Sequence, residues 1–285
     1  MHPRALEAER NCAALSRNAP SSTLPCRGGV LDGEVRAIEL LGTGGSSQVW
    51  RAIDSSGRQL ALKTLRPELR HEPGAQGLLV REYEVLNDVR HPQAVRAYGI
   101  VEHCGATALA MEYLGGGDLV SLAGSNPRHW IGAVGDLLAV LAHVHARGYA
   151  HRDIKARNVL FDLHNRPRLV DFASAAKLGV AGAPGGTTAA HRFRTSRGAL
   201  VGPHEDVFAF AVLLYELMTG RLPFGSDGET AASSIEPPRL SRQAEPALQA
   251  LTELVAGTLR AQNSSGVGSL SRFADVIESV VAGGL

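Results

Sequence analysis

The sequence has little of what marks several large classes of protein. Of its 285 residues only three are cysteine (Cys12, Cys26 and Cys104), and they are widely spaced. This count predicts neither a disulfide framework nor a zinc cluster, and it favours a reducing compartment, the cytoplasm. Charge of one sign is also lacking, since 29 basic and 28 acidic residues leave a formal net charge of +1. Nothing therefore attracts the chain over a distance to nucleic acid or to an anionic membrane, and neither is an expected partner.

Long apolar runs are missing as well. The best candidate for a membrane span, Val207 to Met218, is shorter than the ~20 residues that such a helix needs, and it contains Glu216. Residues 1–17 carry several charges and have no apolar segment of the kind found in secretory signals. No internal repeat is visible. We therefore expect a chain without a membrane span.

The composition is nevertheless that of a folded protein, because 44% of the residues are hydrophobic and 285 residues can bury a sizeable core. Residues 1–33 mix polar residues, proline and glycine without periodicity, which predicts a flexible extension; a short helix from Arg4 to Ser16 is the alternative. Alternation and helical spacing then predict the regular elements. Strands are expected at 37–41, 48–53, 59–65, 95–102, 106–111, 159–161 and 168–170, and helices at 76–89, 130–147, 206–219, 246–259 and 270–281.

One polar stretch near the middle carries the chemistry. The run His151 to Asn158 contains Asp153, Lys155 two residues on and Asn158 five residues on, and Asp171 follows at the end of a short strand. A carboxylate can accept the proton of a substrate hydroxyl, and a lysine can neutralise charge on a transferring phosphoryl group. Asn158 and Asp171 can hold magnesium through oxygen ligands. The pattern indicates phosphoryl transfer; the alternative is a polar surface loop that contains these residues by chance.

These residues resemble the catalytic loop H-R-D-L-x-x-x-N and the magnesium motif D-F-G of the protein kinases. Within that family, Lys155 favours serine/threonine kinases over tyrosine kinases, and the overall pattern is similar to the bacterial Ser/Thr protein kinases. The resemblance covers about Val35 to Val281. It implies ATP as phosphoryl donor, Mg²⁺ (with Mn²⁺ as a substitute) and protein substrates that bear serine or threonine. The catalytic set that it implies is Asp153, Lys155, Lys63 and Glu82, with Asn158 and Asp171 as metal ligands.

The resemblance also implies the fold and the domain organisation. The expected class is α+β, a two-lobed protein-kinase-like fold with a small β-rich N-lobe and a larger helical C-lobe. The flexible extension 1–33 would precede a kinase domain at 34–285, divided into an N-lobe at 34–111, a connector at 112–118 and a C-lobe at 119–285. The sequence carries no prediction of oligomeric state.

A glycine-rich turn lies between the first two expected strands. Gly42-Thr43-Gly44-Gly45-Ser46-Ser47 would let backbone N–H groups approach phosphate oxygens without interference from a Cβ. The segment resembles the kinase loop G-x-G-x-x-G-x-V, with Ser47 in place of the third glycine and Val49 at its end. A dinucleotide-binding turn would need a helix directly afterwards, and a Walker P-loop would need Gly-Lys-Ser/Thr; neither is present.

The third expected strand contains a lysine. A lysine on a strand is ordinarily solvated, but Ala61-Leu62-Lys63 resembles the kinase motif V-A-I-K, whose lysine pairs with the α- and β-phosphates and with a helix glutamate. Glu82 on the next helix is the predicted partner of this lysine, in preference to Glu84. It stands nine residues before His91-Pro92, which is the usual distance in the family.

The predicted connector would be the adenine site. By resemblance, Glu112 and Leu114 would bond the base through their backbone, Met111 would lie at the back of the pocket, Asp118 would reach the ribose, and Leu160 would form the floor. An ordinary linker without ligand contacts is the alternative. The full set of predicted nucleotide contacts is Leu41, Gly42, Thr43, Gly44, Gly45, Ser46, Ser47, Val49, Ala61, Lys63, Met111, Glu112, Leu114, Asp118 and Leu160.

The sequence also departs from the family pattern. Ala173 replaces the glycine of D-F-G, which is costly only if the backbone φ there is positive. No A-P-E motif follows. In the family the glutamate of that motif pairs with an arginine before the last helix, and the matching region 262–266 contains no arginine either. The segment 225–237 is also short. These departures leave a second hypothesis open, a pseudokinase-like ATP-binding or scaffolding module with little turnover.

Regulation is the last expectation. In the kinase family the arginine before the catalytic aspartate can pair with a phosphate on the activation segment. The hydroxyls that could carry such a phosphate are those of Ser174, Thr187, Thr188, Thr195 and Ser196, and none lies between Ser174 and Gly186. Ser174 is too close to the metal motif, and by resemblance the Thr187 hydroxyl would bond the catalytic aspartate and lysine, so a phosphate there would block the site. The other three lie beyond the usual place for such a phosphate in the family. We therefore predict that activity does not require phosphorylation of that segment, and that Arg152 mainly holds the catalytic loop.

Overall fold

The computed structural model describes residues 35–70, 72, 74–181, 200–224, 246–261 and 266–283. These residues form two compact units. Unit 1 contains the described residues up to Arg90 together with Val95–Leu114, and unit 2 contains His91–Ala94 and the described residues from Gly115 onward. The division after Leu114 falls inside the predicted connector 112–118.

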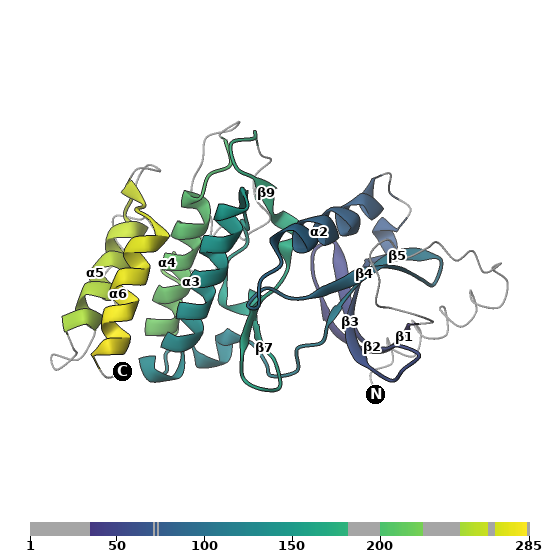
Figure 1. The fold of residues 1–285 in the computed structure, drawn as a ribbon, viewed down its shortest axis with the longest axis horizontal. Coiled ribbons are helices and arrows are strands. Elements are labelled where there is room, and N and C mark those ends of the chain that lie inside the picture. Colours follow the sequence, from purple (N-terminus) through teal and green to yellow (C-terminus); the bar gives the residue numbers. More distant parts are fainter. Residues whose placement is uncertain are drawn as a thin grey trace. The chain divides into compact units, whose positions relative to one another are not determined.

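Unit 1 is an antiparallel sheet with one helix (Figure 1). Its strand order is β1-β2-β3-β5-β4. Each strand predicted for this unit is present, with ends that differ by at most a few residues. The elements are β1 (Arg36–Thr43), β2 (Ser47–Ile53), β3 (Gln59–Leu65), the 3₁₀ turn η1 (Pro67–Leu69), α2 (Ala75–Val89), β4 (Ala97–His103) and β5 (Ala106–Glu112).

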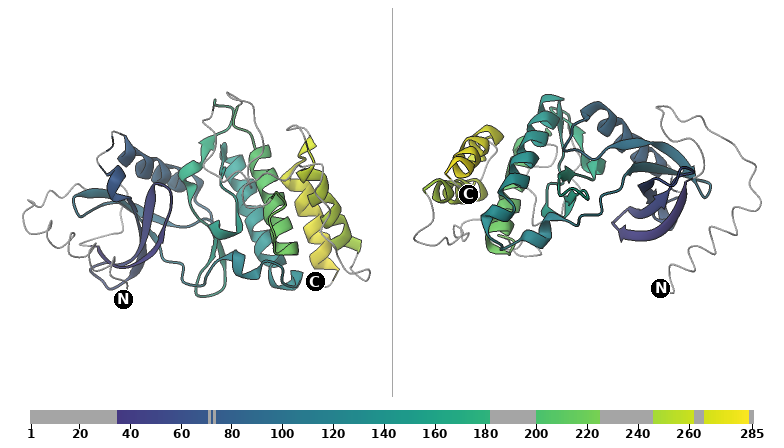
Figure 2. Two further views of the ribbon diagram at one scale, coloured as in Figure 1. Left: turned by 180° about the vertical axis from the view of Figure 1, so that it is seen from behind. Right: turned by 60° about the horizontal axis from the view of Figure 1, so that its bottom comes forward.

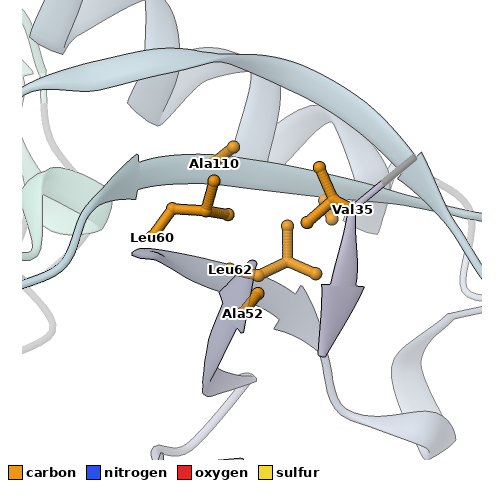
Figure 3. Packing of buried hydrophobic residues seen from close by; sticks show 6 residues of the cluster. Val35, Ala52, Leu60, Leu62 and Ala110 are labelled. Carbon is orange, nitrogen blue, oxygen red and sulfur yellow. The ribbon is translucent and has the colours of Figure 1, made fainter. Parts of the chain in front are cut away.

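The two faces of this sheet have different roles, because successive side chains of a strand point to opposite faces. Leu60 and Leu62 of β3 belong to a buried cluster with Val35, Ala52 and Ala110 (Figure 3). Lys63 lies on the opposite face, and α2 contacts β3, β4 and β5. The buried side chains of α2 recur every three or four residues, as expected for a helix packed along one stripe: Leu79, Glu82, Val85, Leu86 and Val89.

Unit 2 is mainly helical (Figure 2). In it α6 packs against α3 and α5, and α5 packs against α4. The helices are α3 (Ile131–Ala146), α4 (His204–Thr219), α5 (Pro246–Leu259) and α6 (Leu270–Ala282). Two pairs of short strands are also present: β6 (Tyr149–Ala150) pairs with β9 (Ala176–Lys177), and β7 (Val159–Phe161) pairs with β8 (Pro167–Leu169). The 3₁₀ turns of this unit are η2 (Leu119–Leu122), η3 (Pro127–His129), η4 (Ala156–Asn158) and η5 (Phe172–Ser174).

Helix α4 is the buried centre of unit 2. Most of its residues after the first turn are apolar, and ten of its sixteen residues are buried. Asp206 in its first turn is fully buried, which an apolar environment permits only if the carboxylate has partners. None of the helices in the described ranges has the length and apolar character needed to cross a membrane.

Several expectations fall outside the described residues: the extension 1–33 with its alternative helix, the short segment 225–237, residues 262–265, and the hydroxyls of Thr187, Thr188, Thr195 and Ser196. Cys104, in the turn between β4 and β5, is disulfide-bonded. The count of three cysteines argued against a disulfide framework, and it did not predict this single bond.

Candidate functional site

The predicted catalytic loop brings three of its polar side chains together. Nζ of Lys155 donates to both carboxylate oxygens of Asp153, at 3.1 and 2.9 Å. Nδ2 of Asn158 donates to Oδ2 of Asp153 and to the Asp153 backbone oxygen, both at 2.8 Å. Asp153 is buried, whereas Lys155 keeps about a quarter of its side chain exposed. The carboxylate is therefore held in one orientation by a cation and an amide.

The buried ring of His151 links this loop to the end of strand β8. Its Nδ1 accepts the backbone N–H of Asp153 at 3.2 Å, and its Nε2 lies 3.1 Å from the carbonyl oxygen of Val170. These partners fit a neutral ring that carries its proton on Nε2. The ring also meets Phe172 edge-on, with centroids 4.6 Å apart. Burial lowers the pKa of His151, and the nearby carboxylates of Asp206, Asp153 and Asp171 only partly oppose that shift.

Asp206 of α4 anchors the backbone of the same loop. Its carboxylate accepts the backbone N–H groups of His151 (2.8 Å) and Arg152 (2.7 Å) and the Nε2 of His145 (2.7 Å). Burial alone would raise the pKa of Asp206, but the hydrogen bond and charge of His145 and the backbone donors outweigh it, so the pKa is lowered. The sequence prediction did not include Asp206 or His145. A signal was present, since Asp206 is a carboxylate that directly precedes the long apolar run of α4.

The two predicted metal ligands lie at the same end of the β7–β8 hairpin. Asn158 directly precedes β7, Asp171 follows β8 by two residues, and the Val170 N–H donates to the Asn158 carbonyl at 2.9 Å. The Asn158 amide nitrogen is used within the loop, so a cation bound here would meet Oδ1 of Asn158 and the carboxylate of Asp171. Both are the hard ligands that Mg²⁺ prefers. Within the described ranges no group of three or more His, Cys, Asp or Glu side chains could hold a metal.

The backbone at Ala173 decides whether this replacement of the D-F-G glycine is costly. Ala173 lies in η5 (Phe172–Ser174) and is absent from the residues of positive φ. The residue with the left-handed backbone is Asp171, at φ 63°. An alanine at position 173 therefore carries no strain, and the main structural argument for the pseudokinase-like hypothesis is removed.

In unit 1 the predicted pair of Lys63 and Glu82 is formed. Nζ of Lys63 donates to both Glu82 carboxylate oxygens, at 2.8 and 2.7 Å. The side chains are only 6% and 1% exposed. Such burial is tolerated because each charge has its partner.

The glycine-rich turn is shorter than predicted, because β1 extends to Thr43 and β2 begins at Ser47. It closes with a hydrogen bond from the Gly44 N–H to the Ser47 carbonyl, at 2.8 Å. Neither Gly42 nor Gly45 has a heavy atom within 4 Å of where a Cβ would stand, and neither has a positive φ. The fold of unit 1 therefore does not itself require glycine at these two positions.

The remaining predicted nucleotide contacts divide between the two units. In unit 1, Met111 pairs with Ala61 across β5 and β3, and the Glu112 carboxylate accepts the backbone N–H of Arg96 at 2.8 Å. In unit 2, Asp118 and Leu160 form an isolated antiparallel bridge. A Cβ on neighbouring Gly116 would come within 2.6 Å of the Asp162 carbonyl, so this position does require glycine. Leu41, Thr43, Ser46, Ser47, Val49 and Leu114 also belong to unit 1.

Acid should destabilise the protein in a defined pH window. Because the native pKa of His151 is lowered, the unfolded chain takes up a proton below about pH 6.5 that the native state does not, and stability falls as the pH decreases. His91, whose pKa burial also lowers, contributes with the same sign. We expect the free energy of unfolding, measured in urea, to decrease by up to about 1.4 kcal/mol per pH unit for each such group below pH 6.5.

A His91→Gln variant is the control for that experiment and should keep the His151 part of the slope. A stability that stays constant from pH 7.5 to 5.5 would contradict the buried, neutral state of His151.

Comparison with known proteins agrees with this arrangement. A β-rich unit with a buried lysine–glutamate pair and a helical unit with a polar loop anchored on its central helix are the two parts of a kinase fold. Residues 35–264 match the family described as protein kinase domain. The chain belongs to the protein kinase family.

Several similar proteins are bacterial serine/threonine-protein kinases. A probable serine/threonine-protein kinase of Streptomyces coelicolor is 31% identical over 71% of this chain, and PrkC of Bacillus subtilis is 29% identical over 71%. PknA of Mycobacterium tuberculosis is 30% identical over 91% of this chain and 64% of its own length. The chain spans about a third of the first two relatives, 32% and 33%. The predicted resemblance to bacterial Ser/Thr kinases and the predicted α+β kinase fold are confirmed.

Proposed function

We propose that this protein transfers the γ-phosphoryl group of ATP to serine or threonine hydroxyls of protein substrates, with Asp153 as the base. The observation that carries the proposal is the Asp153 carboxylate held by Lys155 and Asn158 within 3.1 Å. The names of the relatives support the choice of serine and threonine. In the reaction, the substrate oxygen bonds to the γ-phosphorus as the bond to the ADP oxygen breaks, and Asp153 takes the hydroxyl proton.

The chain's own residues divide the remaining work. Lys155 neutralises charge on the phosphoryl group in transit, next to the carboxylate that it already contacts. Lys63, fixed by Glu82, binds the α- and β-phosphates of ATP. The glycine turn binds phosphate through its N–H groups, which explains glycines that the fold of unit 1 does not require. The residues of the predicted connector, with Met111 and Leu160, bind adenine and ribose.

A divalent cation fits the donors of unit 2. Asn158 and Asp171 supply two oxygens, and Mg²⁺ in phosphoryl-transfer sites commonly adds nucleotide phosphates and water to one or two carboxylates. Bound Mg²⁺ would neutralise charge on the phosphates. Mn²⁺ accepts the same oxygen ligands.

We also infer the cellular compartment, the domain bounds and the partners of this activity. ATP is the cytoplasmic phosphoryl donor, so the domain, which we assign to residues 34–285 with residues 1–33 as an extension, would act in the cytoplasm. The proposed partners are proteins with accessible serine or threonine.

Loss of the metal ligand Asp171 should weaken ATP binding. The Asp171→Ala variant removes one of the two proposed cation ligands, so we expect ATP affinity in the presence of Mg²⁺ to fall roughly tenfold or more. Isothermal titration of ATP into both proteins, with and without Mg²⁺, measures this. In the variant, Mg²⁺ should no longer improve affinity as it does in the wild type.

The exposed residue Asp275 on α6 offers a matched control, because Asp275→Ala removes a carboxylate far along the chain from the loop. Equal ATP affinities for Asp171→Ala and the wild type in Mg²⁺ would show that Asp171 is not a metal ligand.

A further inference from the structure

Arg152 has a carboxylate partner inside the fold. Its Nε donates to Oε2 of Glu205 at 3.2 Å, and the two side chains are only 9% and 14% exposed. The other Glu205 oxygen lies 3.3 Å from the backbone N–H of Gly202. A charge pair this well shielded from water is less screened by salt than a surface pair.

The backbone of Arg152 needs such support. Its φ is 67°, in the left-handed region that residues other than glycine adopt at an energetic cost. The Arg152 N–H donates to Oδ1 of Asp206 at 2.7 Å. Asp206 therefore holds the backbone of this strained residue, and its neighbour Glu205 holds the side chain. Asp153 is the next residue, so the orientation of its carboxylate depends on this geometry.

Glu205 also links two parts of unit 2. Gly202 follows Val201, whose N–H and carbonyl pair with Val180 and Gly179 at 2.9 Å. Val201 is buried against Ala150 and Ala176. Through Arg152 and Gly202, one carboxylate connects the loop before Asp153 to the chain that pairs with residues 179 and 180.

We propose that Glu205 is a positioning residue for the transfer reaction, and that it supplies the anion that Arg152 requires. Because this carboxylate is part of the chain, the loop holding Asp153 is ordered without a phosphate group on the segment between positions 181 and 200. The proposal rests on the proposed function for its kinetic consequence. Its structural consequence, an ordered loop, can be measured independently of activity.

The kinetic test compares Glu205→Ala and Glu205→Gln with the exposed control Glu253→Ala on α5. Both Glu205 variants should lose roughly 10- to 100-fold in kcat, the size of effect expected when a reacting group is misplaced. The KM for ATP should stay within about twofold, since Glu205 contacts no predicted nucleotide residue. Sodium acetate should restore part of the kcat of Glu205→Ala, because a small carboxylate can pair with Arg152. It should not raise the kcat of Glu205→Gln, of the wild type or of the control.

Phosphatase-treated wild-type protein should transfer phosphate from the first turnover without a lag. A lag that disappears after pre-incubation with ATP would overturn the proposal, because it would show that Arg152 still needs an added phosphate. A kcat of Glu205→Ala equal to that of Glu253→Ala would overturn it as well.

Hydrogen exchange of the amides of residues 151–153 separates this proposal from the proposed function. Their exchange should be faster in Glu205→Ala than in Glu253→Ala, with little change in α6. If the wild type transfers no phosphate but this difference is found, the proposed function fails and the positioning role of Glu205 stands. If the exchange rates are equal, the positioning role fails whatever the activity.

Discussion

Replacing Asp153 with asparagine should lower kcat by roughly 10²- to 10⁴-fold, the usual contribution of a positioned general base. Asparagine has the same shape, and its oxygen can still accept from Lys155 or Asn158, but it cannot take the proton of the attacking hydroxyl. ATP affinity should change little, because Asp153 contacts other loop residues and its predicted role concerns the substrate hydroxyl. Steady-state transfer from labelled ATP, together with ATP titration, measures both quantities.

Asp275→Asn, an exposed aspartate on α6, is the matched control and should behave as the wild type. Retention of kcat within about threefold in Asp153→Asn would rule out Asp153 as the base, since a general base contributes far more. A parallel loss of thermal stability would instead point to a structural role.

Lys63→Met should abolish transfer and should also destabilise unit 1. A lysine that contacted mainly ligand could be replaced with the fold largely intact. The structure gives a reason for a different outcome, since Lys63 is paired with Glu82 without any ligand and both are buried. Removal of one partner leaves a buried, unpaired carboxylate, at a cost of about 3–5 kcal/mol.

The double variant Lys63→Met/Glu82→Gln separates the two effects. Replacing the carboxylate by a neutral amide removes the unpaired charge, so thermal stability should recover in part while transfer stays abolished. Thermal unfolding and transfer assays of the two variants measure this. Recovery of activity together with stability would show that Lys63 serves only the fold.

Much of the fold could be predicted because local pattern determines it. The lysine strand, β7 and α5 have the predicted bounds 59–65, 159–161 and 246–259, and the other predicted elements differ by a few residues at their ends. The two-residue strands β6 and β9 and the 3₁₀ turns were not predicted. The β1–β2 turn was predicted too long, because Gly42 and Thr43 pair across the sheet with Val49 and Gln48. Glycine was interpreted as a break in the strand, whereas the ladder continues through it.

The support of the candidate site could not be predicted in the same way. Asp206 lies more than fifty residues from the loop that it anchors, and only the folded chain brings the N–H groups of His151 and Arg152 to it. The pairing of Arg152 with Glu205 depends equally on tertiary structure. The motif residues could be predicted because their spacing is local, and the residues that orient them could not.

The measurement that tests the central claim most directly is incubation of the purified protein with ATP, Mg²⁺ and a serine- and threonine-containing protein substrate, followed by mapping of the phosphorylated residues. Our account predicts phosphoserine or phosphothreonine on the substrate for the wild type, none after removal of Mg²⁺ with a chelator, and almost none for Asp153→Asn. Tight ATP binding without any transfer, or equal phosphorylation by the wild type and Asp153→Asn, would contradict it.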